Sequence, residues 1–297
     1  MQTVTAFFRR EPAALLGAAW IVLWTAIALT SAMWRPDPSQ YANDQHLEWS
    51  MLPPGATVDL DSGGIAENTL PTRTFWLGTD RFGRDYLSRL VAGSGLSLLV
   101  GLVAVFLSLL IGVPLGAFAG YLGGRFDAVV SWLLQVVWSI PTLLLVLAIT
   151  LAFGKGFEQV FLAIGLSMWV EVARVVRGQT LALRHIEWVE AGRVLGLSTP
   201  RIVLGHILPN LAGPIAVIAS ANFAAAILIE AGLSFMGVGA QIPMPSWGNL
   251  IRDHYSSILT GHAHLALLPG ACIVGLVLAF NALSNALARA SSRRGAS

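Results

Sequence analysis

Long runs of residues without Asp, Glu, Lys or Arg dominate this chain of 297 residues. A helix that crosses the hydrocarbon core of a bilayer needs about 20 consecutive, mostly apolar residues. The uncharged runs cover residues 13–34, 90–124, 128–154, 159–170, 202–229 and 254–288. They predict an all-α membrane protein with six transmembrane helices. Because the run 159–170 is short and ends at Glu171, we expect the second half of that helix at a membrane interface.

The composition excludes an ordinary soluble domain, because only 11% of the residues are charged and 55% are hydrophobic. Soluble domains carry roughly 25% charged residues. The arginines are spread along the chain rather than gathered in a basic stripe, which argues against nucleic-acid binding. Residues 1–34 start like a secretory leader, with Arg9 and Arg10 before an apolar run. That run is long enough to span a bilayer, so we expect a retained first helix.

The distribution of basic residues predicts the orientation, because cytoplasmic loops are enriched in Lys and Arg. Short outer loops would carry only Lys155 and Arg252. The predicted inner segments carry Arg9, Arg10, Arg125, Arg174, Arg177, Arg184, Arg193, Arg201, Arg289, Arg293 and Arg294. Both termini are therefore expected in the cytoplasm. The expected parts are 1–34 (cytoplasmic N-terminus and first helix), 35–89 (periplasmic loop), 90–288 (five-helix core with a hairpin at 184–209) and 289–297 (cytoplasmic tail).

Polar residues near the apolar runs have simple structural interpretations. In the outer loop, Thr79 and Asp80 are expected to cap a short amphipathic helix, with Asp80 reaching Arg84 one turn later. Glu171 and Arg174 lie three residues apart, which predicts a local ion pair. Helix kinks are expected at Pro114 and Pro141.

Signatures of catalysis and of cofactor or metal binding are missing from the sequence. The only lysine, Lys155, has neither the upstream glycine nor the following Ser or Thr of a phosphate-binding loop. His262 and His264 point to different sides of a helix, and Cys272 is the only cysteine. We therefore expect no nucleotide hydrolysis, cofactor or metal site in this chain. A membrane hydrolase is disfavoured because no paired base can be placed.

The segment 187–210 is the most informative polar stretch, and its pattern predicts a helix, a break and a second helix. Gly196 suits a helix C-terminus or a tight turn. Ser198 or Thr199 followed by Pro200 is typical of a helix start. Small residues at 191 and 192 would allow another surface to approach the backbone. A plain connection needs only a few residues, so a docking surface for a soluble partner explains this segment better than a linker does.

This segment resembles the EAA loop of ABC importer permeases. The matching residues are Glu190-Ala191-Gly192, Gly196 after three more residues, and Leu208-Pro209 at the end. Gly192 replaces the usual second alanine. The region from about 75 to 288 is similar to the C-type subunit of dipeptide/oligopeptide-type permeases. The motifs include Leu77-Gly78-Thr79-Asp80, Gly83-Arg84-Asp85, Ile140-Pro141, Glu230-Ala231-Gly232-Leu233-Ser234-Phe235 and Pro245-Ser246-Trp247-Gly248.

The resemblance implies a type I ABC importer permease of the bacterial inner membrane that works by alternating access. It further implies a second homologous permease subunit, two cytoplasmic ATPase subunits that bind ATP and Mg, and an extracytoplasmic substrate-binding protein. The implied cargo is a peptide or another small compound such as nickel, glutathione or a metal chelate. The residues implied in coupling to the ATPase subunits are Glu190, Ala191, Gly192, Arg193, Gly196, Leu197, Ser198, Thr199, Pro200 and Arg201.

Two questions stay open at the level of the sequence. Glu230 is costly in a membrane unless it is paired or faces water, so with Ser234 it is either a polar anchor or part of the translocation pathway. A stand-alone secondary transporter or channel is the alternative function. Such a protein would need a buried ion or proton relay and often inverted repeats. No repeat is visible, and the charges lie at the ends of the apolar runs.

Overall fold

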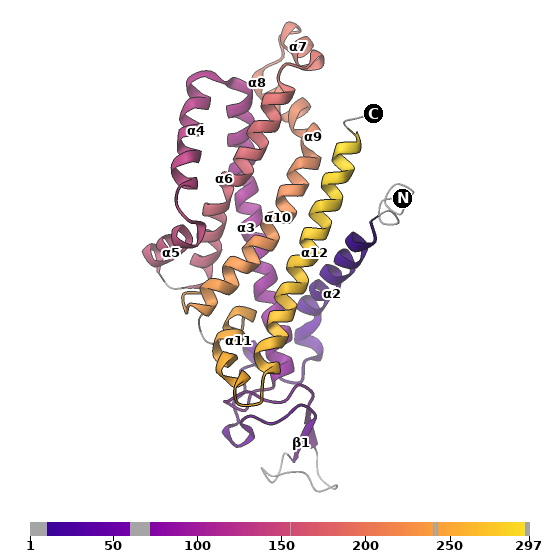
Figure 1. Cartoon of the computed structure of the whole chain (residues 1–297), viewed down its shortest axis with the longest axis vertical. Coiled ribbons are helices and arrows are strands. Elements are labelled where there is room, and N and C mark those ends of the chain that lie inside the picture. Colours follow the sequence, from indigo (N-terminus) through magenta and orange to yellow (C-terminus); the bar gives the residue numbers. More distant parts are fainter. Residues whose placement is uncertain (1–10, 60–71, 155, 240, 242, 295–297) are drawn as a thin grey trace. The chain divides into compact units, whose positions relative to one another are not determined.

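The computed structural model describes residues 11–59, 72–154, 156–239, 241 and 243–294. Arg9, Arg10 and Lys155, which entered the orientation argument, lie outside the described residues, as do residues 60–71 of the first loop and 295–297 of the tail. Among the described residues, five helices are long and apolar enough to cross a membrane. They are α2 (Pro12–Trp34), α3 (Tyr86–Leu122), α6 (Phe157–Leu183), α10 (Ala212–Phe235) and α12 (His264–Arg294) (Figure 1).

The third apolar run does not form the single straight span that the sequence predicted. It forms α4 (Gly124–Trp138) and α5 (Thr142–Phe153), which are bent by 90° and count as a sixth span only if taken together. The cause is Pro141, which has no N–H donor and disfavours a helical conformation at Ile140. The sequence predicted a kink at Pro141, and the structure shows a complete interruption of the helix there. Pro114 lies within α3, which runs without interruption past it.

One helix extends beyond its uncharged run, and one predicted boundary was wrong. The run 159–170 is part of the longer α6, which continues through Glu171 and Arg177, because a helix can carry charged side chains where they find partners or water. The last run begins its helix at His264 rather than at residue 254. Before it come α11 (Trp247–His254) and the short turn η4 (Tyr255–Ile258).

The chain forms two compact units, whose boundaries fall inside α2, α3, α10 and α12. The first unit comprises residues 1–21, 100–229 and 276–297. In it, Gly112, Gly116 and Gly120 of α3 approach the backbone carbonyls of Trp169, Ala173 and Arg177 of α6 so closely that a Cβ atom would clash. Small residues at four-residue spacing commonly permit such contact between membrane helices. The glycine face of α3 therefore determines where α6 lies.

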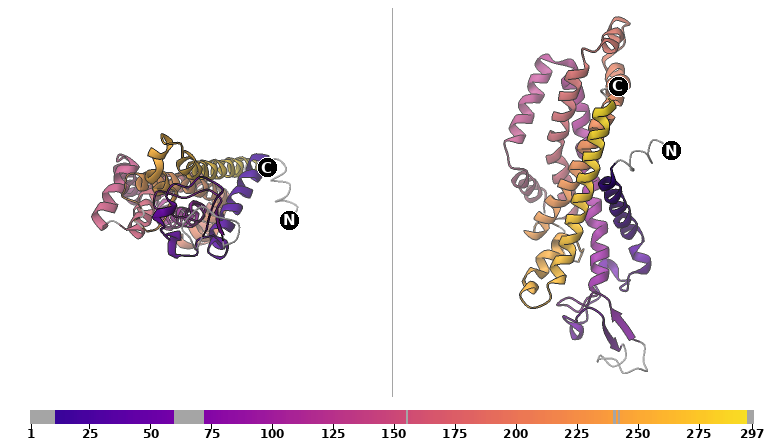
Figure 2. Two further views of the ribbon diagram at one scale, coloured as in Figure 1. Left: turned by 90° about the horizontal axis from the view of Figure 1, so that it is seen from below. Right: turned by 45° about the vertical axis from the view of Figure 1, so that its right-hand side comes forward.

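A helical hairpin at 187–210 completes the first unit. It consists of α7 (Glu187–Val194), α8 (Thr199–Ile202), the π-helical turn η3 (Val203–Ile207) and α9 (Leu208–Asn210). In Figure 1 and in the right-hand view of Figure 2, α4 and α6 lie side by side and the hairpin extends beyond their ends. The predicted order of helix, break and helix is confirmed.

The second unit comprises residues 22–99 and 230–275. Its loop contains two short 3-10 turns, η1 (Gln40–Ala42) and η2 (Leu47–Trp49), and an antiparallel pair of strands, β1 (Ala56–Asp59) and β2 (Thr72–Phe75). In the register, Ala56 faces Phe75 and Asp59 faces Thr72. Trp49, Val58 and Phe75 form the small core of this loop.

The short amphipathic helix expected after Thr79 and Asp80 is absent from the described residues, where turns lead to the start of α3 at Tyr86. Asp80 instead accepts hydrogen bonds from the backbone N–H groups of Phe82 (2.8 Å) and Arg84 (3.1 Å). Such side-chain bonds compete with helix formation, and Gly83 has a φ of +70°. The predicted contact between Asp80 and Arg84 does form, at 2.6 Å, with both side chains buried.

Candidate functional site

The turn of the hairpin is a Schellman motif centred on Gly196, which has a φ of +75°. Its N–H donates to the carbonyl of Arg193 at 3.0 Å, and the N–H of Leu197 donates to the carbonyl of Gly192 at 3.0 Å. These two bonds satisfy carbonyl groups that would otherwise lack partners at the end of α7. The turn predicted at Gly196 is confirmed, and α8 follows with Ser198 as its N-cap and Pro200 in its first turn.

A buried apolar base fixes the hairpin to the ends of α3 and α6. The hairpin residues of this core are Val189, Ile202, Val203 and Ile207. They pack with Ala117, Tyr121, Val172 and Val176, which are contributed by the two long helices. Because these side chains are nearly fully buried, the hairpin is attached as a packed element rather than as a loose loop. A force on its tip would therefore be transmitted to α3 and α6.

The predicted coupling residues divide between the surface and the interior of the hairpin. Glu190, Ala191, Arg193, Gly196, Ser198, Pro200 and Arg201 are exposed, and Leu197 and Thr199 are half-buried. Gly192 is buried, so the expected approach of another protein to its backbone is wrong. A Cβ atom at Gly192 would lie 3.4 Å from Leu197 Cδ1 and 3.8 Å from Ile202 Cδ1, which is ordinary contact. The packing of the hairpin therefore has room for an alanine at this position and does not require glycine there.

Two residues that the sequence analysis missed are the most prominent apolar groups of the hairpin. The exposed fractions of Val194 and Leu195 are 88% and 79%. Val189 and Gly192 are the buried positions of α7. A helix repeats every 3.6 residues, so this periodicity places Val194 and Leu195 away from the base. Helical periodicity within the segment was the signal that could have found them.

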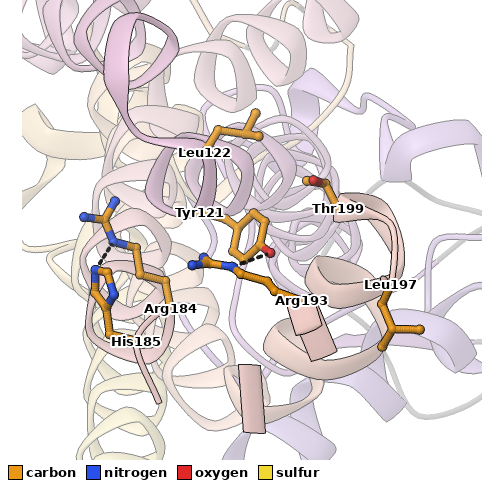
Figure 3. Close-up of a pocket in the computed structure, with 7 residues that line it drawn as sticks. All are labelled: Tyr121, Leu122, Arg184, His185, Arg193, Leu197 and Thr199. Carbon is orange, nitrogen blue, oxygen red and sulfur yellow. Dashed lines mark hydrogen bonds between the residues drawn. The ribbon is translucent and has the colours of Figure 1, made fainter. Parts of the chain in front are cut away.

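A pocket of about 480 Å³ lies beside the hairpin (Figure 3). Its lining residues are Tyr121, Leu122, Arg184, His185, Arg193, Leu197 and Thr199. Arg193 Nε donates to the Tyr121 hydroxyl at 3.0 Å, and its guanidinium lies 4.8 Å from the centre of the Tyr121 ring. Arg184 Nε donates to His185 Nε2 at 2.8 Å. The described part of the lining contains two arginines and no acidic residue, so this pocket is electropositive and suits an acidic group.

Charged residues near the pocket stabilise the surrounding helices. Asp127 at the start of α4 accepts two hydrogen bonds from Arg177 of α6, with 2.7 Å between Nη2 and Oδ2. Bidentate pairs of this kind have a defined geometry as well as a favourable energy. On the hairpin, the carboxylate of Glu190 lies 3.9 Å from His185 Nδ1.

Glu230 and Ser234 lie in a buried serine cluster of the second unit. Ser234 Oγ donates to Glu230 Oε1 at 2.7 Å, and Ser97 Oγ donates to Glu230 Oε2 at 3.4 Å. Ser246 Oγ donates to Ser234 Oγ at 3.2 Å and accepts from the N–H of Asn249, which caps α11. Glu230 is only 1% exposed. These contacts support the interpretation of Glu230 as a polar anchor, and its role in a pathway stays a prediction.

The remaining polar candidates do not form sites. The ion pair predicted between Glu171 and Arg174 is absent from the described residues, because the Arg174 guanidinium lies 3.4 Å from the centre of the Trp138 ring instead. Within the described ranges, no group of three or more His, Cys, Asp or Glu side chains could hold a metal ion. His264 Nε2 is 3.2 Å from the carbonyl oxygen of Leu77.

Comparison with known proteins identifies relatives along most of the chain. Residues 112–296 match the family described as binding-protein-dependent transport system inner membrane component. The dipeptide transport system permease protein DppC of Bacillus subtilis is 38% identical over 74% of this chain and 69% of its own length. The oligopeptide permease OppC of Haemophilus influenzae is 37% identical, covering 83% and 73%. The glutathione permease GsiD of Pectobacterium atrosepticum is 32% identical, covering 94% and 86%.

A solved structure has a similar fold. A chain from inward-facing conformations of the MetNI methionine ABC transporter superposes with a TM-score of 0.55 at 20% identity. The superposition covers 68% of this chain and 95% of the MetNI chain. At this low identity, the similarity supports the predicted type I importer permease fold and nothing more specific.

Proposed function

Because this chain belongs to the family of binding-protein-dependent transport system inner membrane components, it is a permease subunit of an ABC importer, and we propose that its hairpin at 187–210 couples it to ATPase subunits. Membership in this family implies partnership with ATPase and substrate-binding components. We infer that two cytoplasmic ATPase subunits and a second homologous permease complete the transporter. ATP hydrolysis would take place on the ATPase subunits.

The observation that carries this proposal is the contrast between the base and the tip of the hairpin. The base is packed into the core of the first unit. The tip presents Val194 and Leu195 to solvent, next to a pocket lined by Arg184 and Arg193. An exposed apolar group flanked by charged groups is typical of a protein interface. A partner that moves the tip would therefore move α3 and α6, which is what alternating access requires.

The proposed cargo is a peptide or a small compound that resembles one. The names of the relatives specify dipeptide, oligopeptide and glutathione transport. All three kinds of cargo carry an amino group that is mostly protonated at neutral pH. Nickel and metal chelates do not share this group. The names of these relatives therefore favour a peptide-like cargo over nickel or a metal chelate.

We expect Leu195→Asp to release the ATPase subunits from the permease without unfolding it. The side chain is 79% exposed, so the substitution leaves the hairpin core intact. Losing the burial of a leucine at an interface costs about 1.5–3 kcal/mol, or roughly tenfold or more in affinity. The measurement is copurification of the ATPase subunits with the tagged permease.

The control for this experiment is Leu47→Asp, which makes the same change at a side chain that is 70% exposed in the first loop. This variant should retain the ATPase subunits. If the Leu195→Asp permease retained them equally well, the tip of the hairpin would not be the coupling contact.

A second prediction concerns orientation, which we propose places the hairpin in the cytoplasm and the first loop in the periplasm. Single cysteines at Thr72 and Ser198, both exposed, would be placed in a Cys272→Ala chain, which has no other cysteine. In intact cells, a membrane-impermeant maleimide that can enter the periplasm should label only the cysteine at position 72. The cysteine at position 198 should react after permeabilisation. Labelling of both positions in intact cells would disprove this orientation.

A further inference from the structure

Glu171 is an acidic residue near the middle of the membrane-spanning helix α6. Its side chain is exposed, and its carboxylate has no hydrogen-bond or ion-pair partner among the described residues. A carboxylate in that position is expensive in lipid, and such residues usually face a water-filled path or a polar partner. A helix surface that faces lipid therefore does not explain why a glutamate stands at position 171, which indicates a functional role.

The two arginines that follow on α6 are already engaged elsewhere. The guanidinium of Arg174 covers one face of the Trp138 ring, at 3.4 Å from its centre. Arg177 forms its bidentate pair with Asp127. Because neither arginine neutralises Glu171 within the described chain, its negative charge is available to a group from outside.

Glu171 lines a cavity of about 140 Å³ beside the bend between α4 and α5. Apolar walls come from Trp138, Leu145 and Met168, and Thr142 and Ser167 add hydroxyl groups. Among the lining residues that the structure describes, Glu171 is the only charged one. The cavity is much larger than the roughly 10–15 Å³ that one water molecule needs, so a small cationic group can enter together with its attached atoms.

The broken helix reinforces the negative potential of Glu171. Trp138, the last residue of α4, lines the cavity, and a helix C-terminus carries the negative end of the helix dipole. In transporters, helices interrupted within the membrane often flank the substrate site. The 90° bend at Pro141 thus places a helix end beside an uncompensated carboxylate, which is an arrangement suited to a cation.

We propose that Glu171 is a recognition residue of the translocation path, which binds a protonated amino group of the cargo in the cavity at the α4–α5 bend. This inference rests on the proposed importer function, in which the cargo is a peptide-like amine. The hydroxyl groups of Thr142 and Ser167 are placed to contact the rest of the bound group, and the ring of Trp138 borders the site. The carboxylate thereby distinguishes amine-bearing cargo from neutral or anionic compounds.

The first test measures access and charge without using transport. In the Cys272→Ala permease, assembled with its partner subunits, Thr142→Cys places a thiol in the cavity lining. A cationic and an anionic methanethiosulfonate of similar size are compared by their rates of reaction with this thiol. With Glu171 present, the cationic reagent should react faster, and Glu171→Gln should lower the ratio of the two rates by about tenfold.

The matched control is Glu158→Gln, which removes the same charge from the first turn of α6, outside the lining of the cavity. It should leave the ratio unchanged. A thiol at position 142 that reacts with neither reagent, with or without nucleotide, would overturn the proposal, because the site would then face lipid or the second permease. A ratio unaffected by Glu171→Gln would overturn it as well.

The second test uses uptake of trialanine and of N-acetyl-trialanine by the complete transporter. Glu171→Gln should raise the concentration of trialanine needed for half-maximal uptake by about tenfold. It should leave the uptake of the acetylated peptide unchanged. An unchanged value for trialanine would overturn the recognition role. If the wild-type transporter imported neither peptide, the proposed cargo would be wrong, and the thiol measurement would still decide whether Glu171 forms a cation site.

Discussion

Gly196→Pro is expected to abolish ATP-dependent uptake while the membrane helices remain inserted. The backbone at Gly196 has a φ of +75°, whereas proline is restricted to about −65°. Proline also lacks the N–H group that donates to the Arg193 carbonyl at 3.0 Å. The turn cannot form, so Leu195 and the end of α7 lose their position relative to α8. Uptake by the complete transporter and its binding-protein-stimulated ATPase activity are the measurements.

Two milder substitutions control for a general loss of folding. Gly196→Asn should retain most of the uptake, since asparagine adopts the left-handed conformation at low cost. Gly196→Ala should be intermediate, because the left-handed conformation costs about 1–2 kcal/mol for an ordinary residue. No atom of the described residues lies within 4 Å of a Cβ atom at this position, so the backbone alone should determine this order. If the Gly196→Pro variant showed wild-type uptake and wild-type stimulation of ATPase activity, the hairpin would be only a linker and not the coupling element.

Glu230→Ala is expected to lower the thermal stability of the permease strongly. The carboxylate is 1% exposed and accepts hydrogen bonds from Ser234 and Ser97. Removing it leaves buried hydroxyl groups without their acceptor, at about 1–3 kcal/mol for each unsatisfied group. It also leaves a cavity in the packed interior, which adds to the loss. The measurement is thermal unfolding of the purified transporter.

Glu230→Gln separates the two roles that the sequence left open for this residue. Glutamine keeps the acceptor oxygen and nearly the same shape, so an anchor should retain most of its stability and its uptake. Glu158→Ala, at an exposed position, is the control for the loss of a glutamate. If Glu230→Ala and Glu230→Gln both kept the wild-type unfolding temperature and lost uptake, Glu230 would belong to the pathway rather than to the anchor.

The class of protein and much of the hairpin could be predicted from the amino-acid sequence. Uncharged runs long enough to cross a bilayer can be read directly from the order of the residues. In lipid, the backbone N–H and C=O groups of such a run must bond to one another, so the run becomes a helix. The turn at Gly196 and the start of α8 near Pro200 follow from local backbone preferences, which act over a few residues. The similarity of residues 112–296 to a permease family agrees with these local signals.

How those elements pack together, and which side chains stay exposed, depends on contacts between residues that are distant in the sequence. The sequence marked Pro141 as a kink, but the 90° bend and the cavity beside it are properties of the packed helices. Burial of Gly192, exposure of Val194 and Leu195, and the placement of Arg174 over Trp138 depend on neighbours distant in the chain. An apolar run is enough to specify a helix, but the neighbouring helices determine which face of that helix is buried. Glu171 was therefore expected in an ion pair, and tertiary packing instead left its charge facing a cavity.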